Sequence, residues 1–358
     1  METLNYLLSF TNEFLFVYPL LMSFVWMMAG FIFYFKYEHG RSEPELLVSY
    51  PPFSILVPCH NEEEHIRKTI QQLTLIDYPN YEIIIIDDGS SDNTAGIMFG
   101  LSKQYPQVRC VYLKTNQGKA SALTIGSLAS KHEYLLTIDA DALVDPKALK
   151  WIAWHFVRFP RVGAVTGNPR IVNRSTLLAK IQLGEFSTII GLIKRSQRIL
   201  GKILTVSGVM AAFRKSALHS AGYWSTDMAT EDIDITWKLE RRFWDIRYEP
   251  HALCWIYVPE TLRGLWRQRL RWAVGGMEVL KKNILIWKEW RQRRIWPIYI
   301  ESVISVLWAY CYWLSLVLAI FSLATGIGFG LHVRLPFPPL WAGALADQIG
   351  RASCRERV

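Results

Sequence analysis

The chain has few cysteines, and their spacing gives them no shared task. Five occur in 358 residues, and no two form a C-x-x-C pair. This pattern excludes a zinc ribbon or a disulfide framework and indicates reduced packing residues in a cytosolic compartment. The five are scattered along the chain: Cys59, Cys110, Cys254, Cys311 and Cys354.

Glycine-rich phosphate loops are also missing from the sequence. Neither G-x-G-x-x-G nor G-x-x-x-x-G-K-[ST] occurs, which excludes the dinucleotide and P-loop ways of cradling a phosphate. The net charge is +9, but no compact basic stripe with a nucleic-acid-binding signature accompanies it. The positive charge therefore indicates a membrane surface and anionic substrates as partners, and no nucleic acid.

Polar residues are too scarce for an ordinary soluble chain, since 51% of the residues are hydrophobic and the mean hydropathy is +0.13. Residues 14–35 are long and apolar enough to form a membrane helix, and neither a preceding basic region nor a following cleavage site indicates a signal peptide. Lys36, His39 and Arg41 follow this span, whereas residues 1–13 carry no Lys or Arg. The positive-inside rule then predicts an extracytoplasmic N-terminus and a cytoplasmic domain.

The C-terminal part contains a matching apolar stretch. Residues 297–330 are predicted to form a second membrane helix that returns to the outside. Residues 331–347 look like the start of a truncated membrane segment. Residues 348–358 are polar and basic and fit nothing before them, which indicates a non-native tail on a protein that naturally continues with more membrane helices.

Between the two spans, apolar strand-like runs alternate with helical segments. After a proline-containing linker at 36–52, this βαβ spacing predicts an α/β domain with a mostly parallel sheet over residues 53–258. Its first four strands are expected at 53–58, 81–86, 108–113 and 134–138. A strand, a long helix, a helix with an acidic first turn and short strands are then expected at 162–166, 175–195, 230–241 and 245–257.

Two carboxylates follow the fourth predicted strand. Side chains at i and i+2 of an extended segment point the same way, so Asp139 and Asp141 converge beyond its carboxyl end, where open α/β sheets bind ligands. A hard divalent cation that holds a diphosphate, Mg²⁺ or Mn²⁺, would relieve their repulsion. An Asp-rich surface turn is the alternative interpretation.

Residues 259–296 mix aromatic and aliphatic side chains with many arginines and lysines. This composition predicts amphipathic helices on the membrane surface. The segment contains Gln268-Arg-Leu-Arg271-Trp272, for which a solvated basic face touching anionic lipid is the alternative.

Four motifs occur in order: Asp87-Asp88-Gly89-Ser90, Asp139-Ala-Asp141, Thr230-Glu231-Asp232 and Gln268-x-x-Arg271-Trp272. With membrane spans on both sides, they resemble the processive membrane glycosyltransferases of family 2, the group of cellulose, chitin and hyaluronan synthases. Residues 166–170, 184–195 and 230–237 look most like the bacterial synthases of poly-β-1,6-N-acetylglucosamine, a biofilm polysaccharide. The resemblance covers about residues 53–272. It implies a GT-A type nucleotide-sugar-binding domain flanked by transmembrane and interfacial helices, in a multi-pass protein of the bacterial inner membrane.

The donor is expected at the ends of the first strands. A UDP-sugar offers a uracil N–H, which Asp88 can accept, and Asn61 and Glu62 lie in the loop expected to bound the base and ribose. Lys119 can reach the phosphates, with a solvated lysine after a glycine turn as the alternative. The resemblance implies that Asp139 contacts the nucleotide and that the residue two positions later, Asp141, is the metal ligand.

The acceptor side needs one base. A single carboxylate near the acceptor hydroxyl is enough for an in-line displacement that inverts the anomeric carbon. Asp232 is the predicted base, as the resemblance also implies, with Glu231 beside it as a second catalytic residue. Arg271 would stabilise the departing diphosphate, Trp272 offers a flat face to the acceptor sugar, and Gln268 offers it a hydrogen bond.

The resemblance also implies partners. These are UDP-N-acetylglucosamine, the growing glycan, membrane lipid, a small membrane accessory subunit and, in some family members, cyclic di-GMP, for which the sequence shows no motif. Four alternatives stay open: a synthase of another β-glycan such as chitin, hyaluronan or a cellulose-like polymer, a non-processive transferase acting on a lipid, a nucleotide-sugar-binding membrane protein without catalysis, and an inactive fragment.

Overall fold

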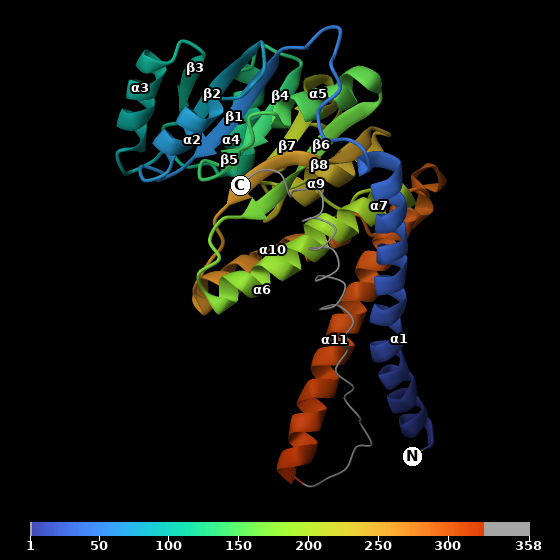
Figure 1. The fold of residues 1–358 in the computed structure, drawn as a ribbon. Helices are drawn as coiled ribbons and strands as arrows, with labels where there is room; N and C mark the ends of the chain where they lie inside the picture. Colours follow the sequence, from blue (N-terminus) through green and yellow to red (C-terminus); the bar gives the residue numbers. More distant parts are fainter. Residues whose placement is uncertain (1, 326–358) are drawn as a thin grey trace.

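A computed structural model of the protein describes residues 2–325. These residues form eight strands: β1 (Phe53–Cys59), β2 (Tyr81–Asp87), β3 (Val108–Tyr112), β4 (Tyr134–Ile138), β5 (Leu143–Val144), β6 (Val162–Ile171), β7 (Met210–Arg214) and β8 (Asp245–Ile256). They make one sheet in the order β3-β2-β1-β4-β7-β6-β8-β5 (Figure 1). The first four strands are mutually parallel, β6 is parallel to β8, and the β4–β7, β6–β7 and β5–β8 pairs are antiparallel. The predicted α/β class with a mostly parallel sheet is confirmed.

The helices alternate with the strands and extend beyond them at both ends. They are α1 (Glu2–Phe33), α2 (Ile66–Leu73), α3 (Thr94–Gln104), α4 (Lys119–Ala129), α5 (Ala148–Arg158), α6 (Leu177–Phe186), α7 (Lys194–Leu200), α8 (Lys215–Ala221), α9 (Glu231–Arg241), α10 (Leu262–Lys282) and α11 (Trp296–Thr325). A π-helical turn, Ser187–Ile193, joins α6 to α7, so the long helix expected at 175–195 runs on to Leu200. Another π-helical turn, Tyr34–Glu38, follows α1, and 3₁₀ turns at Ile286–Lys288 and Trp290–Gln292 precede α11.

The sheet is covered on both faces. Ile55 and Val57 of β1 pack into one core with α2, α3 and α5, whereas Leu56 between them packs into the other core with α4, α8 and α9. Since both faces are buried, the strands read as continuous apolar runs, and each fully buried aliphatic side chain contributes about 1.5–3 kcal/mol. This burial is why the first four strands could be recognised in the sequence.

The β6–β8 ladder differs from the prediction. The strand expected at 162–166 continues to Ile171, and one strand of 12 residues replaces the short strands expected at 245–257. The register shifts where Thr166 pairs with Tyr248 but Asn168 pairs with Leu253, because β8 bulges around Pro250. Proline cannot donate to a ladder and tolerates such bulges, and Asn168 Nδ2 donates to the Pro250 carbonyl at 2.8 Å across the gap.

Two helices of the described residues are long and apolar enough to cross a membrane, Ser9–Glu38 and Trp296–Thr325. They contact each other through polar groups: Tyr18 Oη lies 2.7 Å from Ser305 Oγ, and Trp308 Nε1 donates to the Leu15 carbonyl at 3.0 Å. Because α1 starts at Glu2, most of the predicted extracytoplasmic segment belongs to the same helix as the predicted span. The predicted segments at 331–347 and 348–358 lie outside the described residues.

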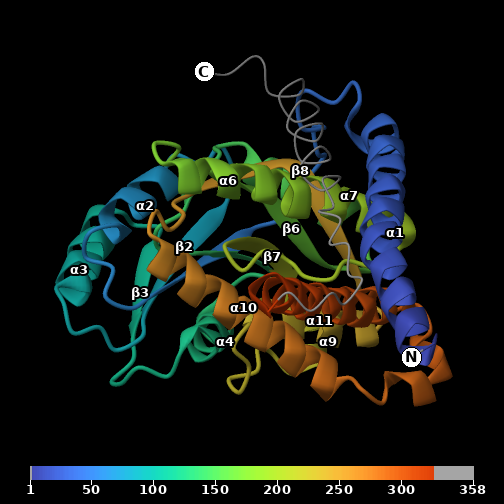
Figure 2. The ribbon, with the colours of Figure 1, turned by 90° about the horizontal axis from the view of Figure 1, so that it is seen from below.

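The predicted amphipathic segment contains α10, which spans 21 residues. In Figure 1, α6 and α10 lie below the sheet, on the side from which α11 extends. Seen from below, they cross the view on either side of the segment that leads into β7 (Figure 2). That segment carries part of the candidate site.

Candidate active site

The carboxyl ends of three strands place the first polar residues of the site. β1 and β2 end in register, with Cys59 opposite Asp87, and β4 runs parallel to β1 on its other side. Because these ends share one sheet edge, the loops that follow them are neighbours. They carry Asn61 and Glu62, Asp88, and Asp139 and Asp141 in turn.

Lys119 joins the two halves of the site. Its Nζ lies 2.5 Å from Asp139 Oδ1 and 3.4 Å from Glu231 Oε1, and it donates to the Gly208 carbonyl at 3.1 Å. Burial would lower the pKa of Lys119, but Asp139 and Glu231 outweigh it and raise the pKa. The residue predicted to reach the phosphates is therefore held between the Asp139 loop and the start of α9.

Asp232 is fixed at the start of α9. Its Oδ2 accepts a hydrogen bond from the Gly208 amide at 3.1 Å, and its Oδ1 accepts from the Ile233 amide at 2.9 Å. Burial, and then the neighbouring Glu231, raise the pKa of Asp232 to about 6, although Lys119 acts in the opposite direction. A base works best when its pKa lies near the working pH, so the raised pKa of Asp232 is compatible with its predicted role as the general base.

Gly208 packs tightly against this carboxylate. A Cβ added at Gly208 would lie 3.0 Å from Asp232 Oδ2 and 3.4 Å from its Cγ. The segment around Gly208 is also bonded on two sides, because the Ser207 amide donates to Thr166 Oγ1 at 2.8 Å and the Val206 amide donates to Thr236 Oγ1 at 2.9 Å. These contacts leave Asp232 little freedom to move.

Lys194 is the buried charge that the sequence interpretation missed. It begins α7, is 4% exposed, and donates to Thr166 Oγ1 at 3.2 Å. Burial lowers its pKa to about 8, and the Asp232 carboxylate partly offsets that effect. Lys194 lies inside a segment that resembled the poly-N-acetylglucosamine synthases, but only the π-helical turn before α7 turns it inward, and the sequence gives no sign of that turn.

We expect Lys194→Met to move the acidic limb of the pH–rate profile to higher pH. Lys194 lowers the pKa of Asp232, so without it the base stays protonated to a higher pH. The transfer rate at pH 6 should fall about two- to tenfold, and less at pH 8. Steady-state rates from pH 5 to 9 check this, with the exposed Lys180→Met as the control. An unchanged profile would show that Lys194 does not act on Asp232.

The loop that carries Asp88 is held closely against the loop after β3. Asp88 is 3% exposed, its Oδ1 accepts from the Gln117 amide at 2.8 Å, and its Oδ2 accepts from the Gly118 amide at 2.7 Å. Gly89 has φ +65°, and a Cβ there would lie 2.6–2.9 Å from the backbone of Thr115 and Asn116. Each carboxylate oxygen of Asp88 keeps a second lone pair, so the carboxylate can still accept a further hydrogen bond, and the bond to a uracil N–H stays a prediction.

Asn61 and Glu62 tie the loop after β1 to the loop after β2. Asn61 adopts φ 57°, its amide donates to Ser90 Oγ at 2.9 Å, and its Oδ1 accepts from the Ser91 amide at 2.8 Å. The Glu62 amide donates to Thr94 Oγ1 at 2.8 Å. The two residues therefore shape the loop where a base and ribose were predicted.

The carboxylates of Glu62, Asp139 and Asp141 are the kind of ligand that a hard cation prefers. Burial and then Asp141 raise the pKa of Glu62, and burial and then Asp139 raise the pKa of Asp141, so negative charge gathers here without enough positive charge to balance it. Within residues 2–325, no three His, Cys, Asp or Glu side chains come close enough to hold an ion by themselves. Mg²⁺ is commonly bound by one or two carboxylates plus substrate phosphates, and this donor set suits that arrangement.

The α10 residues are less closely connected to the others. The Trp272 ring packs 6.3 Å from Phe186 and carries the Arg269 guanidinium 4.4 Å above it. Gln268 Oε1 is buried without a hydrogen-bond partner. Arg271 is exposed, and no hydrogen bond or ion pair of the described residues joins it to the carboxylates of the site. The structure thus brings together Lys119 and the carboxylates, and the roles of Gln268, Arg271 and Trp272 stay predictions.

Comparison with known proteins places this site in a family. Residues 51–275 match the family described as "Glycosyltransferase like family 2". The chain belongs to glycosyltransferase family 2. Among its relatives, the poly-β-1,6-N-acetyl-D-glucosamine synthase of Staphylococcus epidermidis strain RP62A is 44% identical over 84% of this chain and 74% of its own length. The synthase of Staphylococcus aureus strain COL is 43% identical over 83% of this chain and 73% of its own length.

The predicted GT-A type fold of this glycosyltransferase is confirmed by a solved structure. The mannosyltransferase of Pyrobaculum calidifontis, determined with GDP-mannose and Mn²⁺, superposes with a TM-score of 0.69 over 99% of this chain and 98% of its own, at 20% sequence identity. At that identity the likeness concerns the fold.

Proposed function

We propose that this family 2 glycosyltransferase transfers N-acetylglucosamine from UDP-N-acetylglucosamine to a growing poly-β-1,6-N-acetylglucosamine chain, with inversion at the anomeric carbon. The substrate is supported by the name that the staphylococcal relatives share at 43–44% identity. The single observation that carries the chemistry is Asp232, a carboxylate held by Gly208 with its pKa raised to about 6. In this proposal Asp232 takes the proton of the attacking 6-hydroxyl.

The donor side of the proposal rests on the connected loops. Asp88 accepts the uracil N–H, and Asn61 and Glu62 bound the base and ribose. Asp139 contacts the nucleotide. Lys119, already 2.5 Å from Asp139, places a positive charge where the diphosphate departs, which favours the transition state more than the ground state.

Asp141 would hold the divalent cation, Mg²⁺ or Mn²⁺. A bound cation neutralises negative charge on the diphosphate as the glycosidic bond to the donor breaks. The support is the donor set described above and the Mn²⁺ in the archaeal mannosyltransferase structure. Asp141 keeps its carboxylate beside Glu62 and Asp139 and thereby positions the leaving-group end of the donor.

The membrane setting completes the proposal. Residues 14–35 span the bacterial inner membrane, as does the predicted span 297–330 in its described part, up to residue 325. Residues 53–258 lie in the cytoplasm, and residues 259–296 lie on the membrane surface. The exposed apolar residues of both long helices support this arrangement. We further propose that the enzyme is processive, with Gln268, Arg271 and Trp272 along the acceptor path, and that it exports the polymer with a small membrane subunit. Control by cyclic di-GMP is part of the same hypothesis.

Membranes that contain the protein test this function directly. Incubated with UDP-N-acetylglucosamine and Mg²⁺, they should form a polymer that a glycosidase specific for β-1,6-linked N-acetylglucosamine degrades. Membranes without the protein are the control. A polymer that resists the glycosidase would indicate a different β-glycan, and transfer to lipid alone would indicate the non-processive alternative.

A further inference from the structure

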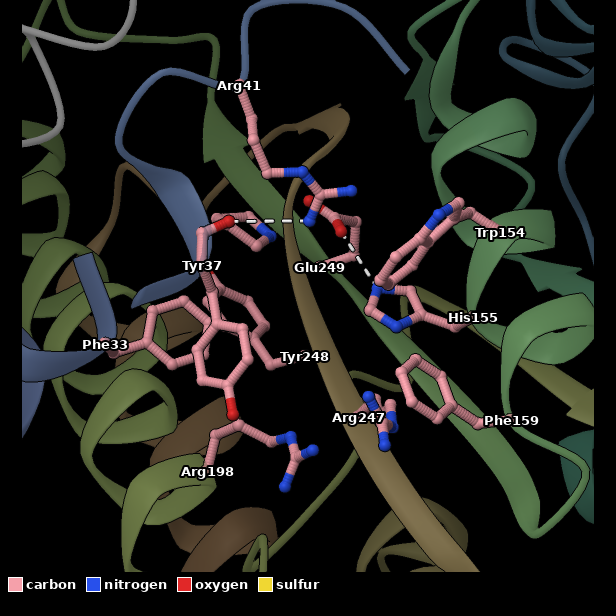
Figure 3. A pocket seen from close by; sticks show the side chains of 11 residues that line it. Phe33, Tyr37, Arg41, Trp154, His155, Phe159, Arg198, Arg247, Tyr248 and Glu249 are labelled. Atoms are coloured by element: carbon pink, nitrogen blue, oxygen red, sulfur yellow. Dashed lines mark hydrogen bonds and ion pairs between the residues drawn. The ribbon is translucent and has the colours of Figure 1, made fainter. Parts of the chain in front are cut away.

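A pocket lies where the first predicted membrane helix meets the α/β domain (Figure 3). Its walls come from four parts of the chain. The first is the end of α1 with the turn and loop that follow it, and the second is the C-terminal half of α5. The other two are α7 and the middle of β8. None of its lining residues belongs to the candidate active site. The lining combines aromatic rings with three arginines, Arg41, Arg198 and Arg247.

Two of these arginines have no anionic partner in contact. Arg247 is stacked on the Phe159 ring, with its guanidinium carbon 3.6 Å from the ring centroid. Arg198 makes no hydrogen bond or ion pair with any residue from 2 to 325. Burial and then Arg198 lower the pKa of Arg247 to about 10, whereas Asp245 and Tyr37 act in the opposite direction. Two arginines that line one pocket without a bonded anion favour an anionic ligand.

Unpaired polar atoms gather in the same pocket. Of the eight buried side-chain atoms without a hydrogen-bond partner in the described residues, four belong to residues that line it: Arg41 Nη2, His155 Nδ1, Arg247 Nε and Tyr248 Oη. Arg41 Nη2 lies 3.6 Å from Glu45 Oε1 in an ion pair, which leaves three of these atoms without a partner. Tyr248 is 2% exposed and His155 is 6% exposed. Buried polar groups are normally bonded, so three unpartnered atoms on residues that line one pocket indicate a polar ligand.

The carboxylate in the wall, Glu249, is already engaged. Its Oε2 lies 2.9 Å from His155 Nε2, and its Oε1 lies 2.8 Å from His251 Nδ1. Since His155 Nε2 shares its proton with Glu249, the other ring nitrogen, Nδ1, is an acceptor. The pocket therefore offers several donors on the arginines and Tyr248, and one acceptor on His155.

We propose that this pocket binds a phosphate group with a neighbouring hydroxyl. The planar forks of Arg198 and Arg247 match phosphate oxygens, and the Tyr248 hydroxyl donates to a third oxygen. The hydroxyl of the ligand donates to His155 Nδ1. The oxygens of a tetrahedral phosphate can accept from donors that do not lie in one plane, whereas the lone pairs of a carboxylate lie in the plane of the group.

The position of the pocket favours a phospholipid headgroup over a free organic phosphate. Phe33 and Tyr37 line it at the end of the candidate membrane span Ser9–Glu38, where headgroups would lie. Phosphatidylglycerol carries both the phosphate and the hydroxyls. A bound headgroup ties the end of α1 to α7 and β8, next to the buried ion pair of Glu38 with Arg195.

The full chain, purified in a neutral detergent, tests the proposal by thermal unfolding and native mass spectrometry. One arm adds phosphatidylglycerol and the other adds soluble glycerol phosphate. We expect a one-to-one adduct and a higher unfolding midpoint with at least one of the two ligands. The ligand that raises the midpoint more shows whether the pocket binds a lipid headgroup or a free organic phosphate. The double variant Arg198→Gln/Arg247→Gln should weaken that binding tenfold or more. Failure of both arms would overturn the proposal.

The matched control is Arg67→Gln/Arg242→Gln, which removes the same charge from exposed positions outside the pocket. It should bind like the natural chain, and an equal loss in this control would show unspecific attraction to anionic lipid. A second readout does not need the ligand. Arg198→Gln alone should raise the unfolding midpoint of the ligand-free protein, because it removes a positive charge that faces Arg247. A lower unfolding midpoint would contradict the proposed repulsion between these two arginines.

Discussion

Asp232→Asn should lower the rate of sugar transfer by about 10²–10⁴-fold while the affinity for UDP-N-acetylglucosamine changes little. The asparagine oxygen can still accept from the Gly208 amide, as the carboxylate does at 3.1 Å, so the side chain keeps one of its two backbone bonds and loses the one from the Ile233 amide. The amide cannot take a proton from the acceptor hydroxyl at neutral pH. Radiolabelled polymer formation and a calorimetric titration with UDP measure the two quantities separately.

The transfer rate of the natural chain should also depend on pH through Asp232. The deprotonated form of Asp232 is the active one, so with a pKa of about 6 the rate should rise as the pH rises through about 6 and level off above it. Asp227→Asn is the control, since Asp227 is exposed in the loop before α9. If Asp232→Asn weakened donor binding as much as it slowed transfer, its assignment as the base would be wrong.

Asp141→Asn should lower activity by about 10²–10³-fold, the size of effect expected when charge stabilisation of a leaving group is lost. Removal of divalent cations with a chelator should abolish activity in the natural chain, and added Mg²⁺ or Mn²⁺ should restore it. The variant should also bind Mn²⁺ more weakly in the presence of UDP, which electron paramagnetic resonance measures without any turnover.

Asp77→Asn removes a carboxylate at an exposed site, where Asp77 pairs with Lys150, and is the matched control for Asp141→Asn. It should retain full activity and Mn²⁺ binding. If Asp141→Asn bound Mn²⁺ as the natural chain does, Asp141 would not be the metal ligand. Glu62 would then be the next candidate, because its carboxylate interacts with Asp141.

The sequence allowed the parallel half of the sheet to be predicted because β1, β2 and β4 are buried on both faces and are followed by polar residues. Asp139 was predicted to contact the nucleotide and Lys119 to contact the phosphates, but the ion pair between these two residues was not predicted. Lys194 could not be predicted, since its inward direction depends on the π-helical turn Ser187–Ile193. The β6–β8 ladder was missed for a similar reason, because the bulge around Pro250 interrupts the alternation on which strand prediction depends. These failures concern backbone irregularities that only tertiary contacts stabilise.

The order of strands in the sheet has a consequence for the synthesis of the protein. β1 to β4 come from residues 53–138 and pair through connections of moderate length, so this half can fold while later residues are still on the ribosome. β7 then pairs with β4 from residues 210–214, and β8 closes the ladder with β6 only when residue 256 has emerged. The nascent chain thus acquires the strand ends proposed to hold the nucleotide before the proposed base is locked in place.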